Sequence, residues 1–179
     1  MARYAVLLRG INVGGHAKIP MADLRELLAG LGHTEVRTLL QSGNAVFTAA
    51  KGAPERLAAR IEKAADEAWE LNVRCLIRTA AELDAVIDAH PLAEVATNGS
   101  RMMALFLSAN PDPKLLAAHD PVTLAPEQVR VGDRVIYQWC PDGVMAAPPV
   151  GPFVERHLKV AVTARNWNTV TKLAVLLKS

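Results

Sequence analysis

The stretch Tyr4-Ala-Val-Leu-Leu-Arg-Gly-Ile-Asn-Val-Gly-Gly15 indicates how the first half of the chain folds. Its apolar start, Tyr4 to Leu8, predicts a buried strand, and the segment from Ile19 to Leu28 predicts the opening of a helix. Three glycines, an arginine and an asparagine therefore lie between a strand end and a helix start. Glycines let backbone N–H groups turn outward, and a helix N-terminus attracts anions. The stretch thus predicts a binding site for an anionic or polar ligand.

Downstream of this loop the first half continues as helices and strands. Apolar residues at helical spacing predict helices over 21–31 and from Pro54 to about Glu70. Shorter apolar runs predict strands over 36–41, 45–48 and 73–78. The order β-α-β-β-α-β is that of a ferredoxin-like unit, in which the first and third strands are neighbours. We therefore expect the 9–15 loop and the turn over 41–44 to lie side by side.

The second half repeats the same order less clearly, as strands over 101–108, 128–131 and 135–140 and helices over 113–119 and 152–159. Its fourth strand is expected to be the short segment 160–163, followed by an amphipathic helix from about Asn168. The fold class is therefore α+β, with two ferredoxin-like (βαββαβ) subdomains, the second degraded, and an extra C-terminal helix. We expect the subdomains at 1–79 and 100–179 and a linker helix and loop at 80–99. The linker helix starts with a capping box, Thr79 and Glu82.

Composition sets limits on function. The 179 residues are 51% hydrophobic with a net charge of +2, as in an ordinary globular protein, and this charge does not by itself indicate nucleic acid. Cys75 and Cys140 are expected to be reduced core residues, which favours a cytoplasmic location. No apolar run approaches the length needed to span a bilayer, so we expect no membrane association.

A further polar cluster lies near the end of the chain, at Thr163-Ala-Arg-Asn-Trp-Asn-Thr169. One interpretation adds it to the loop and turn as a ligand site, with the tryptophan as a stacking surface. The alternative is structural: Asn168 or Thr169 caps the last helix and Trp167 packs between the subdomains. The full set of predicted ligand-binding residues is Arg9, Gly10, Asn12, Gly14, Gly15, Lys18, Gln41, Ser42, Gly43, Asn44, Arg165, Asn166, Trp167, Asn168, Thr169 and Lys172.

Several of these motifs together resemble a bacterial family, the domain of unknown function 1697. The matching stretches cover essentially the whole chain: Leu8 to Gly15, Lys18 to Met21, Leu40 to Asn44 with Val46-Phe47, and Thr163 with Arg165 to Thr169 and Lys172-Leu173. The resemblance implies a ferredoxin-like α+β fold of two subdomains. It implies no activity.

Known catalytic patterns are not matched. The spacing Gly10 to Gly15 fits a P-loop, but His16 and Ala17 stand where a lysine and a hydroxyl are required. The histidines have no metal-ligand spacing, and the three polar clusters hold no carboxylate, so His16 is the sole candidate for acid–base chemistry and Ser42 has no evident base. These observations argue against an enzyme and for a protein without a cofactor.

Three functions remain open. The first is a module that binds a small anionic or nucleotide-like ligand, which is our working hypothesis. The second is a single-stranded nucleic-acid binding protein, with Tyr4 and Phe47 on an open sheet face. The third is a structural or interaction protein whose motifs hold the subdomains together. The sequence does not indicate the oligomeric state.

Overall fold

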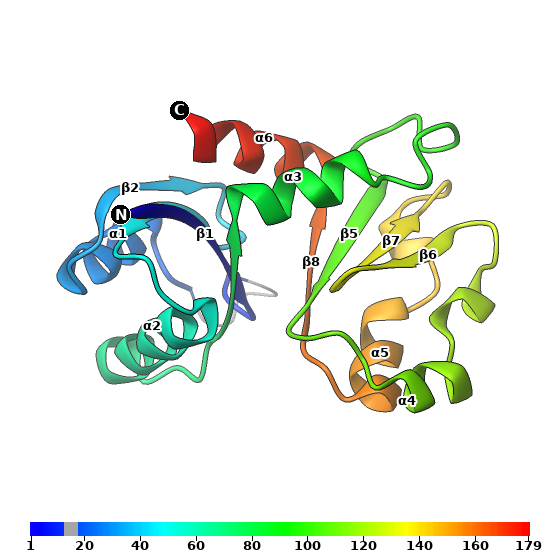
Figure 1. The fold of residues 1–179 in the computed structure, drawn as a ribbon, viewed down its shortest axis with the longest axis horizontal. Coiled ribbons are helices and arrows are strands. Elements are labelled where there is room, and N and C mark those ends of the chain that lie inside the picture. Colours follow the sequence, from blue (N-terminus) through cyan, green and yellow to red (C-terminus); the bar gives the residue numbers. More distant parts are fainter. Residues whose placement is uncertain (13–17) are drawn as a thin grey trace. The chain divides into compact units, whose positions relative to one another are not determined.

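The computed structural model describes residues 1–12 and 18–179, and Figure 1 shows its helices and strands. The chain forms two compact units. Unit 1 comprises Met1–Leu83 and Leu173–Ser179, and unit 2 comprises Asp84–Lys172. Each contains a four-stranded antiparallel sheet with helices, as the predicted α+β class requires. In the described residues no helix is both long and apolar enough to cross a membrane.

Unit 1 has the strand order β2-β3-β1-β4, so β1 pairs with both β3 and β4 as predicted. Helices α1 and α2 cover one face of the sheet (Figure 1), and the core between them includes Leu8, Phe47, Leu24 and Ile61. The elements are β1 (Ala2–Arg9), α1 (Met21–Gly30), β2 (Thr34–Leu39), β3 (Asn44–Ala49), α2 (Pro54–Trp69), β4 (Arg74–Thr79) and α3 (Ala80–Asp88), which runs on into unit 2.

Unit 2 has the equivalent order, β6-β7-β5-β8. Its fourth strand was predicted too early: β8 covers Val162–Asn166 and not 160–163, so Arg165 and Asn166 belong to a strand. The residue opposite Arg165 on β5 is small, Ala104. The elements are β5 (Met102–Leu107), α4 (Pro113–Ala118), η1 (Pro121–Leu124), β6 (Val129–Gly132), β7 (Val135–Trp139), η2 (Val144–Ala146), α5 (Val150–Leu158), β8 and α6 (Trp167–Lys178), whose residues from Leu173 onward belong to unit 1.

The two units repeat each other in detail. In unit 1 the buried Arg78 of β4 lies opposite Ala5 of β1, just as Arg165 lies opposite Ala104 in unit 2. Each of these strands leads directly into a helix with a polar cap. At the start of α3 the predicted capping box is present, with the Glu82 backbone N–H donating to Thr79 Oγ1 at 3.1 Å. The repeat inferred from the order of elements therefore extends to individual residue pairs.

Candidate functional site

One side chain, Asn12, joins the two segments that were predicted to lie side by side. Its Nδ2 donates to the carbonyl of Gln41 at 2.7 Å and to that of Ile19 at 3.0 Å, while its Oδ1 accepts from the Ile19 N–H at 2.7 Å. The Leu8 N–H also donates to the carbonyl of Gly43 at 2.8 Å. The loop after β1 and the β2–β3 hairpin are therefore in contact, as strand order alone predicts. Two predicted site residues, Gly14 and Gly15, and the candidate base His16 lie outside the described residues.

Two residues of the hairpin have structural roles. Gly43 has a φ of +91°, and a Cβ atom there would lie 2.8 Å from Ile11 Cδ1. Asn44 is fully buried, and its Nδ2 donates to the carbonyl of Leu39 at 2.9 Å and to Ser42 Oγ at 2.8 Å. The fold thus accounts for both residues through close packing and turn closure.

Positive charge gathers at the same end of the sheet. Arg9, the last residue of β1, lies directly opposite Arg74, the first residue of β4, and both are exposed. Side chains of such a pair leave the backbone about 4.5–5.5 Å apart, and like charges there repel. Arg74 Nε is 4.0 Å from Glu62 Oε1, which also accepts the Cys75 N–H at 2.9 Å.

Lys18, Gln41 and Ser42 are exposed too, in the loop and the hairpin that Asn12 joins. We call Arg9, Arg74, Lys18, Gln41 and Ser42 the cationic corner. Sequence reasoning predicted the strand over 73–78 but did not include Arg74 among the site residues. The signal that could have found it is the antiparallel pairing itself, because the first residue of β4 must face the last residue of β1.

Unit 2 offers an internal comparison for this corner. Asn110, in the loop after β5, donates from Nδ2 to Asp133 Oδ1 at 2.9 Å and accepts the Arg134 N–H at 2.7 Å. It therefore links the loop after β5 to the β6–β7 hairpin by hydrogen bonds, as Asn12 links the loop after β1 to the β2–β3 hairpin. We call this arrangement the asparagine clamp. In the position of the Arg9–Arg74 pair, however, unit 2 has Ser108 and Ala161, joined by a hydrogen bond of 2.9 Å from the Ser108 N–H. The clamp is common to both units, and the charge is not.

The cluster near the end of the chain lies in unit 2, and much of it is structural. Arg165 is buried; its Nη1 donates to Thr163 Oγ1 and to the carbonyl of Ala164, both at 2.8 Å. Burial lowers the pKa of Arg165 to about 10, so the guanidinium stays charged at neutral pH. Its charge is held within the sheet and bonded to neighbouring residues.

The cap of α6 differs from the predicted one. Asn166, and not Asn168 or Thr169, accepts the Thr169 N–H at 2.9 Å, because the strand runs on to Asn166 and the helix begins directly after it. Thr169 is buried and its hydroxyl also bonds Asn166. Asn168 is exposed but packs against Gly99, where a Cβ atom would collide with its side chain. Lys172 is exposed one turn later.

Trp167 takes part in an aromatic cluster within unit 2. Its ring centroid is 4.3 Å from that of His90 and 6.2 Å from that of Tyr137. Burial lowers the pKa of His90 and raises that of Tyr137 to about 12, and the Tyr137 hydroxyl donates to the carbonyl of Val86 at 2.7 Å. This packing accounts for a half-buried tryptophan without a stacked ligand.

Other chemical interpretations find little support in the residues that the structure describes. Among them no three potential ligands group together to hold a metal ion. Burial raises the pKa of both thiols, at Cys75 and Cys140, so neither is a ready nucleophile. Tyr4 and Phe47, the rings of a nucleic-acid platform, are 3% and 0% exposed within the core of unit 1, so they cannot stack on bases.

Comparisons with known proteins show the fold and the family. No curated protein matches the chain. A solved structure, described as "conserved bacterial protein SP0830 from Streptococcus pneumoniae", is 23% identical with a TM-score of 0.68, and the match covers 98% of each chain. A family model described as "Protein of unknown function (DUF1697)" matches residues 1–137. The chain therefore belongs to this family of proteins of unknown function, as its motifs predicted.

Proposed function

We propose that this protein binds a small anionic ligand, of the phosphate or nucleotide class, at the cationic corner of unit 1. The observation that carries the proposal is the comparison between the units: the fold builds the same corner twice, and only unit 1 has two arginines facing each other there. The two like charges repel each other, although Glu62 offsets part of the charge of Arg74. An anion between them removes that repulsion.

The side chains present suit such a ligand. Two guanidinium groups can each make paired hydrogen bonds to phosphate or carboxylate oxygens. Lys18 adds a third cation, while Gln41 and Ser42 are exposed donors and acceptors that can bind polar edges. The cluster containing Arg165 and Lys172 was predicted to contribute as well. Of that cluster, Lys172 and Asn168 are the exposed members, so they are the residues to test there.

The test is a titration with inorganic pyrophosphate and with AMP, followed by calorimetry and thermal shift. The key variant, Arg9→Ser with Arg74→Ala, reproduces the residues of unit 2. It is expected to lower the affinity by about tenfold or more, since a hydrogen bond to a charged group contributes about 1.5–3 kcal/mol. The melting temperature of the unliganded protein should not fall, because the repulsion between the two arginines is removed with them. The charge-matched Arg56 control combines Arg56→Ala with Lys51→Ala, and so removes two exposed positive charges outside the corner.

Two outcomes oppose the proposal. Equal affinity of the double variant and the Arg56 control would show that the anion binds elsewhere or only through net charge. No binding of either probe, together with oligonucleotide binding that weakens steeply with salt, would favour nucleic acid instead.

We also infer that the protein works in a reducing compartment such as the cytoplasm. Cys75 and Cys140 are both free and buried, as is usual for thiols in reducing compartments. Cell fractionation tests this location, and recovery in an oxidising compartment would contradict it.

A further inference from the structure

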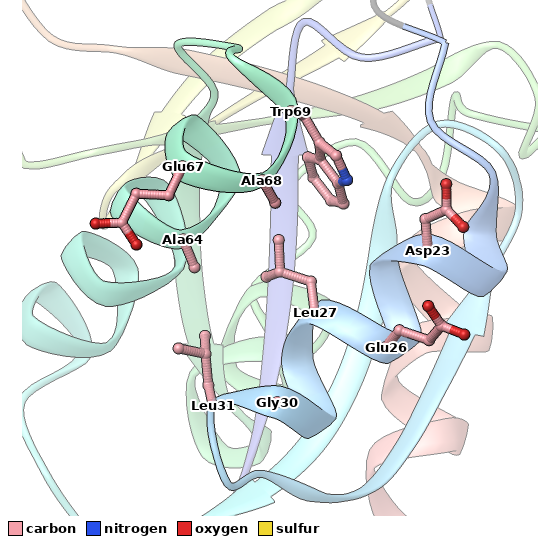
Figure 2. Close-up of a pocket in the computed structure, with 9 residues that line it drawn as sticks. All are labelled: Asp23, Glu26, Leu27, Gly30, Leu31, Ala64, Glu67, Ala68 and Trp69. Atoms are coloured by element: carbon pink, nitrogen blue, oxygen red, sulfur yellow. The ribbon is translucent and has the colours of Figure 1, made fainter.

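Unit 1 has a second feature, a groove between α1 and α2 on the outer side of these helices (Figure 2). Its volume is about 500 Å³. Leu27 of α1, Leu31 directly after α1, and Trp69 of α2 are half-buried against the core and line its floor. Figure 2 shows Leu27 and Trp69 between the two helices. Small residues complete the lining: Gly30, Ala64 and Ala68. The groove thus offers apolar surface with room above it.

The rim of this α1/α2 groove is acidic. Asp23 and Glu26 lie on α1 and Glu67 on α2, and none of the nine lining residues is basic. Lys63 approaches Glu67 at 4.0 Å, but both side chains are strongly exposed, so this pair neutralises little. Arg60, which is exposed, also reaches the groove, with Nη2 donating to the carbonyl of Leu31 at 3.2 Å. The nine lining residues nevertheless include three carboxylates and no basic side chain, in a chain whose net charge is +2.

We propose that the α1/α2 groove binds an amphipathic helix of a partner protein, with an apolar stripe flanked by lysine or arginine. Apolar anchors at helical spacing would meet Leu27, Leu31 and Trp69, and the basic flanks would meet the carboxylates on both walls. The walls are helices, which have no unpaired backbone edge for an extended peptide. A helix needs no such edge, because it satisfies its own backbone hydrogen bonds.

The charge also separates this partner from a lipid surface. Anionic lipid headgroups attract basic residues and repel a rim that holds Asp23, Glu26 and Glu67. The lined stretch from Asp23 in α1 to Leu31, its C-cap, is about 12 Å long at 1.5 Å per residue, so a partner helix of two to three turns covers it. This proposal does not depend on the anion site.

The probe is a fluorescein-labelled synthetic helical peptide with leucines at i, i+3, i+4 and i+7 and lysines on both flanks. A peptide with glutamates in place of the lysines is the charge control. Ala68→Arg fills the groove and adds positive charge. Ala59→Arg lies nine residues earlier on α2, half a turn away at about 100° per residue, and both alanines are exposed.

Fluorescence anisotropy should show the lysine peptide binding the native protein and Ala59→Arg equally, and Ala68→Arg at least about tenfold more weakly. Equal binding to both variants, binding of the glutamate peptide, or no binding of the lysine peptide to the native protein would each overturn the proposal. Sedimentation of the native protein adds one more test: self-association lost in Ala68→Arg would make a second copy of this chain the occupant and refute a separate partner.

Discussion

Replacing Asn12 by alanine is expected to lower the free energy of unfolding by about 3 kcal/mol. The Asn12 side chain makes three hydrogen bonds, to Ile19 twice and to Gln41 once. Each contributes about 0.5–1 kcal/mol net in a partly exposed setting. Asn12 also has a φ of 55°, a left-handed conformation that costs alanine about 1 kcal/mol more than asparagine.

A glycine at the same position separates these two effects. Asn12→Gly loses the hydrogen bonds but adopts the left-handed conformation freely, so it should lose about 2 kcal/mol. In a chain of this size about 3 kcal/mol corresponds to a fall of roughly 6–12 °C in melting temperature. Calorimetry and urea denaturation measure both quantities.

Asn72→Ala is the matched control, because Asn72 is exposed near the same edge of the sheet. It should change the free energy of unfolding by less than about 0.5 kcal/mol. If Asn12→Ala were no less stable than Asn72→Ala, the contact between loop and hairpin would not depend on this side chain, and our account of the corner would be refuted.

Three more predictions concern single residues of unit 1. Gly43→Ala should lower the free energy of unfolding by about 2–4 kcal/mol in urea denaturation, because the new Cβ atom would collide with Ile11. Gly10 also has a positive φ, +80°, but open space around it, so Gly10→Ala should lower this free energy by only about 1 kcal/mol. Equal losses in the two variants would contradict this account. Burial, and to a smaller extent a nearby arginine, lowers the pKa of His33 below its usual 6.5. The neutral His33 therefore contributes its full stability above about pH 6.5, and this contribution is lost as the pH falls below that value. His33→Gln should lose less stability in acid than the native protein, and an equal loss of stability would exclude this role of His33. Cys75 is 5% exposed, and burial raises the pKa of its thiol, so iodoacetamide should label Cys75 only after the protein unfolds. Rapid labelling of the native protein would show that β4 opens.

The sequence predicts the architecture well because the first half has clear periodicities. Once β1, β2 and β3 are assigned, the strand order of a ferredoxin-like unit places the loop after β1 beside the hairpin, and the contact of Asn12 with Gln41 confirms it. The side chains of the contact were not predictable in the same way. Asn44 and Ser42 are both polar turn residues, yet Asn44 is buried and Ser42 is exposed.

The burial of Arg165 in unit 2 was harder to predict, because β5, the strand that pairs with it, is distant in the sequence. Buried Arg165 lies opposite Ala104, and that pairing is not visible in the local sequence. The cap of α6 was misplaced for a related reason. Asn166 and Asn168 are equally suitable as helix caps by residue type. Asn166 still pairs with Met103 as the last residue of β8, so the helix begins directly after it and Asn166 is the residue that caps the helix.

Comparing the two hairpins separates what the fold requires from what it does not. Arg134 occupies the position of Gly43, since the Leu107 N–H donates to its carbonyl as Leu8 does to Gly43, and both have a positive φ. Unit 1 needs glycine there because Ile11 packs against it. Close approach of a ligand is therefore not needed to explain this glycine.

The same comparison explains the next residue. Asn44 pairs with Leu39 across a four-residue turn and bonds the Leu39 carbonyl, whereas Val135 pairs with Gly132 across a two-residue turn. A longer turn leaves more backbone groups to satisfy, and the Asn44 amide satisfies one of them. Turn geometry thus accounts for Gly43 and Asn44, and the Asn12 clamp recurs in unit 2. The two units differ instead in the facing pair Arg9 and Arg74, where unit 2 has Ser108 and Ala161, and for this reason our proposal places the anion at that pair.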